Sequence, residues 1–137
     1  MFDRILLAVD GSEDSGKAVT MASELASISK GEVVVFHVRE KAAVRYGSFD
    51  VNLAEADGDI ADEIARELKE QGVSARSERH VAYHGHTGKM IAEGARENDA
   101  DVIVMGSRGL SDLAGIFLGS VAHKVLHLSP CPVLIIK

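Results

Sequence analysis

The sequence predicts an α/β fold in which helices cover both faces of a parallel sheet. Four short runs of apolar residues have almost no polar interruption, which is typical of strands buried on both faces. Helical patterns separate these runs, so strands and helices alternate, and this order favours right-handed crossovers between parallel strands. The runs lie at Ile5–Val9, at Val33–Phe36, within Asp101–Met105 and at Val133–Ile136.

The first strand–helix–strand unit has clear boundaries. Ile5–Val9 forms the first strand, and Ser12 is a good N-cap for the helix that follows. The two acidic residues after Ser12 place negative charge at the helix N-terminus, where the dipole favours it. We expect Gly31 to be the C′ residue of this helix and Glu32–Val38 to form the second strand.

The middle of the chain is less regular. Arg39–Asp57 shows no clear periodicity, and we expect it to be a connector of some length. The helix after it ends at Gly72, and Val73–Tyr83 follows as a third strand. This strand alternates more and carries more charge than the others, which indicates the edge of the sheet. The apolar face of the helix consists of Leu53, Ala56, Ile60, Ile64 and Leu68.

The last part of the chain contains two further helices and two further strands. We expect Thr87 to cap the third helix and Asp101–Met105 to form the fourth strand. After a glycine-rich stretch, the fourth helix spans about Ser120–Leu128, and Val133–Ile136 forms the fifth strand. We find no internal repeat and no linker, so residues 1–137 are predicted to form one domain.

Composition and charge exclude several classes of protein. The net charge is −6, and Lys and Arg are scattered without interleaved aromatic residues, which argues against binding to DNA or RNA. No apolar run approaches the roughly 20 residues of a membrane-spanning helix, and the first residues lack the pattern of a secretory signal. We therefore expect a soluble, cytoplasmic protein. The single cysteine, Cys131, is better explained as a small packed residue than as a nucleophile.

Glycine and serine are concentrated between the fourth strand and the fourth helix. The sequence reads Gly106-Ser107-Arg108-Gly109, then nine residues, then Gly119-Ser120-Val121. Glycines let a ligand approach the backbone, and a helix N-terminus binds phosphate through its amides and its dipole. The Ser120 hydroxyl would add a donor, and Arg108 could contact an outer phosphate. We favour phosphate binding over the alternative that these residues only shape a turn; the Walker and dinucleotide-binding signatures are both absent.

The chain resembles the ATP-binding members of the universal stress protein family over nearly its full length. The family motif G-x2-G-x9-G-[ST] is met at every position by the glycines and the serine just described. Further similarity lies in Ile5–Ser12, in His37-Val38 at the end of the second strand, and in Pro132-Val133-Leu134. The resemblance implies an open, Rossmann-like sheet of five parallel strands in the order 3-2-1-4-5, with ATP lying across the first and fourth strands.

The resemblance also implies a role for each residue of the nucleotide site. Ala8, Val9 and Asp10 would flank the adenosine, and Val38 would meet adenine largely through its backbone. Met105 and Gly106 would line the ribose side, and the phosphates would be held by Gly109, Gly119, Ser120 and Val121. Asp10 also has a structural explanation, because a carboxylate here can cap the following helix; we weight ligand contact above it.

Two groups of histidines raise the question of a metal site. His123 and His127 are four residues apart on the fourth helix, and His80, His84 and His86 lie near the end of the third strand. No glutamate completes an H-E-x-x-H pattern, and no cysteine completes a tetrahedral set. We therefore interpret both groups as solvated or locally hydrogen-bonded histidines. We assign no catalytic residue and no side-chain metal ligand.

The function we favour is an ATP-binding regulatory protein of the stress response, a switch or sensor that signals to an unidentified protein partner through the loop Leu110–Leu118. ADP or AMP is an alternative ligand. Mg²⁺ or Mn²⁺ should accompany the phosphates, because a net charge of −6 offers little other neutralisation. The alternative functions are a slow ATPase or phosphotransferase and a dimerisation module without nucleotide. An uncovered apolar edge strand is an aggregation hazard, so we expect a homodimer through Val133, Leu134, Ile135 and Ile136.

Overall fold

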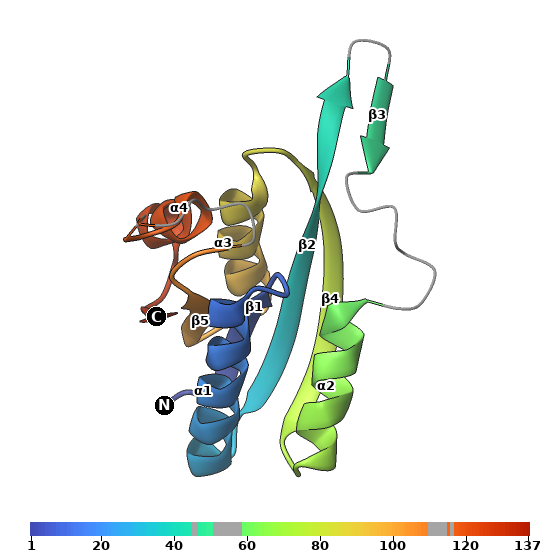
Figure 1. Cartoon of the computed structure of the whole chain (residues 1–137). Helices are drawn as coiled ribbons and strands as arrows, with labels where there is room; N and C mark the ends of the chain where they lie inside the picture. The colour runs from blue at the N-terminus through green and yellow to red at the C-terminus, as the bar shows by residue number, and fades with distance from the viewer. Residues whose placement is uncertain (45–46, 51–58, 110–114, 116) are drawn as a thin grey trace.

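The computed structural model describes residues 1–44, 47–50, 59–109, 115 and 117–137. Five strands run parallel in the order β4-β2-β1-β5-β6, which is the predicted order 3-2-1-4-5 (Figure 1). The strands are β1 Arg4–Val9, β2 Glu32–Val44, β3 Gly47–Asp50, β4 Ser74–Tyr83, β5 Val102–Gly106 and β6 Val133–Ile136. The helices are α1 Glu13–Ser29, α2 Ile60–Glu70, α3 Thr87–Glu97 and α4 Ser120–Leu128.

Two helices lie on each face of the sheet, as predicted. Successive side chains of a strand point to opposite faces, so each central strand supplies two cores. In β1, Ile5 and Leu7 belong to the core under α1 and α2, whereas Leu6 and Ala8 belong to the core under α3 and α4. Burial on both faces explains why the strand is a continuous apolar run. None of the described helices is both long and apolar enough to cross a membrane.

The connector predicted for Arg39–Asp57 is wrong in its first part. The strand β2 continues to Val44, and β3 pairs with it antiparallel, Lys41 lying opposite Asp50. Figure 1 shows the end of β2 and β3 projecting past the other strands and beyond the helical layers.

The helix after this extension begins later than its apolar pattern indicated. Leu53 and Ala56, which we assigned to its apolar face, lie outside the described residues. The helix α2 begins at Ile60, after its N-cap Asp59, whose Oδ1 accepts a hydrogen bond from the Ala61 amide at 2.7 Å.

The helix caps are partly as predicted. Ser12 caps α1, and its Oγ accepts a hydrogen bond from the Ser15 amide at 3.2 Å. At the other end Gly31 follows the C-cap Lys30 and so occupies the predicted C′ position, but the left-handed residue is Lys30, with φ 60°. Glycine is needed at position 31 for space, because a Cβ there would collide with the carbonyl oxygen of Phe2.

Thr87 does not cap α3. The N-cap is His86, which makes no side-chain capping hydrogen bond, and Thr87 is the first helical residue. Its hydroxyl instead donates to Glu40 Oε1 at 2.9 Å, which joins the start of α3 to the extended part of β2. The sequence pattern of a threonine near a helix start is the same whether or not the threonine caps the helix. Here its hydroxyl bonds to the Glu40 carboxylate instead of to the helix.

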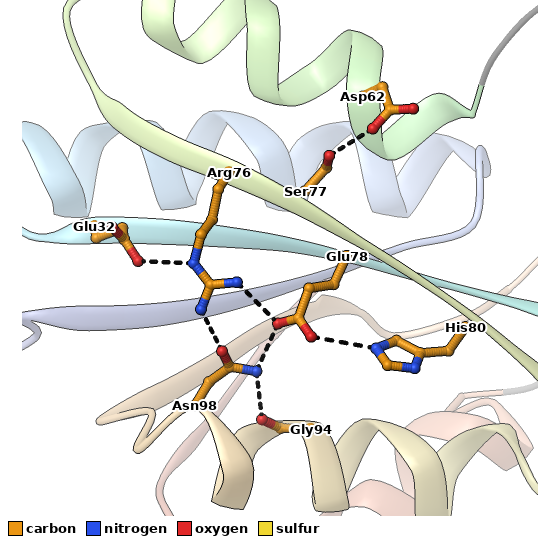
Figure 2. Close-up of polar contacts among 8 residues, drawn as sticks. All are labelled: Glu32, Asp62, Arg76, Ser77, Glu78, His80, Gly94 and Asn98. Carbon is orange, nitrogen blue, oxygen red and sulfur yellow. Dashed lines mark hydrogen bonds and ion pairs between the residues drawn. The ribbon is translucent and has the colours of Figure 1, made fainter.

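The strand β4 lies at one edge of the sheet, as its charge predicted, and a polar network covers it (Figure 2). Arg76 donates to Glu32 of β2 at 3.2 Å and to Glu78 at 3.2 Å. Asn98, the C-cap of α3, donates to the same Glu78 at 2.7 Å and accepts from Arg76. Charged side chains on an edge strand discourage pairing with another chain.

Gly94 and Gly16 offer a matched test of the packing of α3 on the sheet. A Cβ at Gly94 would collide with the Phe36 ring, whereas a Cβ at Gly16 would meet no atom of another element within 4 Å. We expect Gly94→Ala to lower the free energy of unfolding by about 1–3 kcal/mol through overpacking. Gly16→Ala should raise it by about 0.5–1 kcal/mol through its higher helix propensity. Urea denaturation measures both, and equal effects would contradict this packing.

Candidate functional site

A cavity of about 270 Å³ opens where the carboxyl ends of β1 and β5 meet the middle of β2. The strand β1 lies between the other two in the sheet. The chain passes from β1 to β2 on one side and later enters β5 on the other, so the strand order reverses here. In open α/β sheets this is where ligands bind.

The cavity wall contains every nucleotide-site residue predicted from the sequence except one. Ser120 is the exception, because it is exposed at the first position of α4 and does not line the cavity. The donor role of its hydroxyl stays a prediction. The predicted residues that line the wall are Ala8, Val9, Asp10, Val38, Met105, Gly106, Arg108, Gly109, Gly119 and Val121.

Sequence reasoning missed about half of the wall. The second strand was predicted to end at Val38, but β2 continues past the cavity and brings Glu40 to it as well. Ser12 was interpreted only as a helix cap, which it is, but it also lines the cavity. The additional lining residues are Ser12, Ser15, Phe36, His37, Glu40, Thr87, Ile91, Ser107 and Ala122.

Ser107, in the cavity wall, joins three segments of the chain. It is buried, and its amide donates to the Ile136 carbonyl at the end of β6 at 2.7 Å. Its carbonyl accepts from the Gly119 amide, the N-cap of α4, at 2.6 Å. Its hydroxyl donates to Asp14 Oδ2 in the first turn of α1 at 2.8 Å. One residue therefore fixes the edge strand, the start of α4 and the start of α1 relative to one another.

Gly106 is required by the same junction. A Cβ at this position would lie 2.7 Å from Asp14 Cβ, 2.8 Å from Asp14 C and 3.0 Å from the Ser15 amide nitrogen. Two of these atoms belong to backbone, which cannot move aside without shifting α1. We predicted that the motif glycines admit a ligand. At Gly106 the atoms that exclude a side chain belong to α1, so the glycine there allows a close approach of helix and strand.

The carboxylate of Asp14 is surrounded by donors and cations. The Ser107 hydroxyl, helped by Lys17 and Arg108, holds the pKa of Asp14 below the ordinary aspartate value of 3.8, while burial acts in the opposite direction. Lys17 Nζ lies 3.7 Å from Asp14 Oδ1, and Arg108 Nε lies 3.9 Å from Asp14 Oδ2. Arg108, predicted to contact a phosphate, thus forms an ion pair with Asp14 through Nε and stays partly exposed.

Asp10 takes part in the turn between β1 and α1. Its Oδ1 accepts a hydrogen bond from the Ser12 amide at 2.9 Å, and its own amide donates to Ser15 Oγ at 3.1 Å. The alternative that Asp10 caps the helix is wrong, because Ser12 is the N-cap; the Asp10 carboxylate instead holds the turn that leads to it. Asp10 also lines the cavity, so a ligand contact through the carboxylate remains a prediction.

The strand β2 contributes two polar side chains to the cavity wall, His37 and Glu40, and contacts with other elements hold both of them. His37 Nδ1 lies 2.9 Å from Asp59 Oδ2, and both side chains are nearly buried. Asp59 also caps α2, so the imidazole is fixed to the start of that helix. Further along, the Glu40 carboxylate accepts from Thr87 and lies 2.9 Å from His84 Nδ1. These contacts leave little rotational freedom to His37 and Glu40, the two polar side chains that β2 contributes to the wall.

Acidic groups predominate around the cavity. Asp10 and Glu40 carry carboxylates into its wall, against one guanidinium from Arg108. Among the described residues, no group of three or more His, Cys, Asp or Glu side chains could hold a metal ion. The histidines near the end of β4 have local partners, as we interpreted them: His80 lies 3.3 Å from Glu78, and His84 is held by Glu40.

Comparison with known proteins gives a consistent result. The model of the universal stress protein family matches residues 1–137. The universal stress protein YxiE of Bacillus subtilis is 36% identical, with 100% of both chains covered. Among solved structures, the hypothetical protein MJ0577 of Methanocaldococcus jannaschii superposes with a TM-score of 0.82 at 26% identity, covering 100% of this chain and 96% of that one. A universal stress protein solved in complex with cAMP gives a TM-score of 0.66 at 25% identity, covering 98% and 97%.

The depressed pKa of Asp14 predicts how stability changes in acid. The folded pKa lies below the unfolded one, so between the two values the unfolded state binds more protons and the free energy of unfolding rises with pH. The contribution of Asp14 is complete above the unfolded pKa and is lost as pH falls through the folded pKa. We expect the wild type to lose more stability than Asp14→Asn between about pH 5 and about pH 2. Urea denaturation across that range measures it, and parallel pH profiles would contradict the assignment.

Proposed function

Because this chain belongs to the universal stress protein family, we propose that it binds an adenine nucleotide in the cavity where the ends of β1 and β5 meet the middle of β2. The observation that carries the proposal is the composition of the wall, where the motif glycines Gly106, Gly109 and Gly119 meet Val38 and the end of β1. A family member solved with cAMP supports an adenine ligand. ATP is the nucleotide we favour, with ADP or AMP as alternatives.

The wall offers a different environment to each part of the nucleotide. The apolar side chains of Val38 and Ala8 suit the adenine ring. Met105 and Gly106 would line the neighbouring part of the cavity, which we assign to the ribose. Asp10 is the acceptor for a ribose hydroxyl in this arrangement. Gly109 and Val121 then approach the phosphates, with Arg108 partly exposed beside them.

The phosphate donors come from the first turn of α4. The Gly119 amide already donates to the Ser107 carbonyl, so it contributes no bond to a ligand. Helix geometry leaves the next three amides, those of Ser120, Val121 and Ala122, without an intrahelical acceptor. Val121 and Ala122 line the cavity, and the helix dipole adds positive potential there. Ser120 would then act mainly through its backbone, since its side chain is exposed.

A divalent cation should accompany a polyphosphate ligand. The carboxylates of Asp10 and Glu40 outnumber the single guanidinium of Arg108 around the cavity. Mg²⁺ or Mn²⁺ bound mainly through phosphate oxygens would lower the charge that the wall has to accommodate. The protein residues hold the nucleotide in this arrangement, and the nucleotide holds the ion.

The role we infer for the bound nucleotide is a signal to a regulatory partner. Backbone amides bind substrate and product phosphates alike, which gives affinity without much acceleration. Efficient phosphoryl transfer also needs a residue that orients the attacking group and cations on the transferring phosphoryl group. A switch further requires that ATP and ADP differ in affinity for two states of the protein. The loop predicted to change state, Leu110–Leu118, lies largely outside the described residues.

Replacing Gly119 tests the nucleotide site. Gly119 is buried at the start of α4, and a branched side chain there would enter the cavity beside the phosphate donors. We expect Gly119→Val to weaken ATP binding by at least about tenfold, or about 1.4 kcal/mol. Titration calorimetry in Mg²⁺ measures it. The control is Gly16→Val, whose Cβ points into open space, and equal affinity of both variants and the wild type would refute the site.

The homodimer through β6 is tested by charge at the edge. The strand β6 pairs only with β5 among the described strands, and its Leu134 side chain is 36% exposed. Pairing with the same strand of a second copy would cover this apolar edge. We expect a dimer that Leu134→Lys converts to monomer, as measured by sedimentation. The matched control is Val81→Lys on the opposite edge strand, where exposure is 38%. A wild-type monomer at micromolar concentration would contradict the proposal.

A further inference from the structure

From the sequence we interpreted His123 and His127 as solvated or locally hydrogen-bonded histidines; on their geometry we now propose that they form a chelating site for a divalent transition-metal ion on the exposed face of α4. The two residues are four positions apart in the helix Ser120–Leu128, a spacing that places side chains on one face one turn apart. Both are exposed. The site is separate from the nucleotide cavity, whose wall contains neither residue.

The distance between the two rings suits a common metal ion. The imidazole rings are in edge contact, with centroids 4.7 Å apart and an interplanar angle of 69°. A metal about 2.1 Å from each coordinating nitrogen lies roughly 3.2 Å from each ring centroid. Two centroids 4.7 Å apart then subtend an angle of roughly 95° at the metal, close to the angles of octahedral and tetrahedral coordination. Rotation of the side chains would be enough to direct one nitrogen of each ring to the ion.

The surroundings favour a cation at this place. His127 lies in the last turn of α4, where the carbonyl end of the helix dipole is negative. Lys124 is next to His123 in sequence, but its Cβ and Cγ lie against Gly88 of α3, so its stem follows the neighbouring helix. The chain as a whole carries a net charge of −6.

The ligand type determines which ions the site would take. Neutral imidazole suits Zn²⁺, Ni²⁺ and Cu²⁺, whereas Mg²⁺ prefers oxygen ligands and belongs with the nucleotide. No third His, Cys, Asp or Glu side chain joins the pair among the described residues, so water completes the coordination. Two ligands with open positions give moderate affinity and a stoichiometry of one ion per chain.

Metal binding at this pair would stabilise α4. Chelation joins the last two turns of a nine-residue helix, and an ion that binds only the folded chain raises stability by mass action. The first turn of the same helix is fixed to Ser107 through Gly119. The start of α4 forms one side of the cavity, and the ion would bind toward the other end of the same helix. Binding there would therefore stabilise a helix that contributes to the cavity wall.

The test uses untagged full-length protein treated with EDTA and then titrated with Ni²⁺ in a calorimeter. We expect one ion per chain, with His123→Gln and His127→Gln each weakening binding by at least about tenfold, because the second ligand of a chelate binds intramolecularly. The control is His86→Gln, an exposed histidine at the start of α3, which should leave the affinity unchanged.

A second readout distinguishes a chelate from scattered weak contacts. Cu²⁺ electron paramagnetic resonance should report two nitrogen ligands in the wild type and one in either single variant. We expect each variant to fold, because both positions are exposed. Circular dichroism checks this. Equal Ni²⁺ affinity in the wild type and the double variant would overturn the proposal, as would a loss of binding in His86→Gln.

Discussion

The buried hydrogen bond between Ser107 and Asp14 joins the segments on which the cavity depends. It forms only because Gly106 lets the end of β5 approach the first turn of α1. The same serine holds the end of β6 and the N-cap of α4 through its backbone. Two walls of the cavity therefore share one anchor. We expect that a side chain at position 106 or a loss of the carboxylate would move both helix starts together, and with them the α4 amides that we propose as phosphate donors.

The same junction determines the electrostatics of the site. Asp14 engages Arg108, the only cation among the cavity-lining residues described, while Asp10 and Glu40 add negative charge. In the nucleotide complex that we propose, the wall would rely on backbone amides at the start of α4 rather than on side-chain cations to hold phosphate. Such donors suit a module that retains a nucleotide and reports its presence. They give little preference for the transferring phosphoryl group, because they bind ground state and product alike.

Sequence reasoning captured the features that repeat along the chain or match a motif. Continuous apolar runs such as Ile5–Val9 predict strands buried on both faces, and the strand order came from the family resemblance. The β2–β3 hairpin was not predicted, because its residues show no clear apolar period and the antiparallel pairing brings together segments that no sequence motif marks. The side-chain contacts Ser107–Asp14 and His37–Asp59 were not predicted either, because each joins residues far apart in sequence and no local pattern marks the partner. A motif predicted that Gly106 matters, whereas the structure gives an additional reason, the approach of α1.

The identity of any nucleotide that the protein carries from the cell tests the central claim most directly. Protein purified without added nucleotide would be denatured, and the released small molecules would be identified by mass spectrometry and counted against chain concentration. The account predicts an adenine nucleotide at a substantial fraction of one per chain, and restored occupancy when the stripped protein is mixed with ATP and Mg²⁺. If no nucleotide is released, and the stripped protein binds neither ATP nor AMP at millimolar concentration, the cavity is not a nucleotide site.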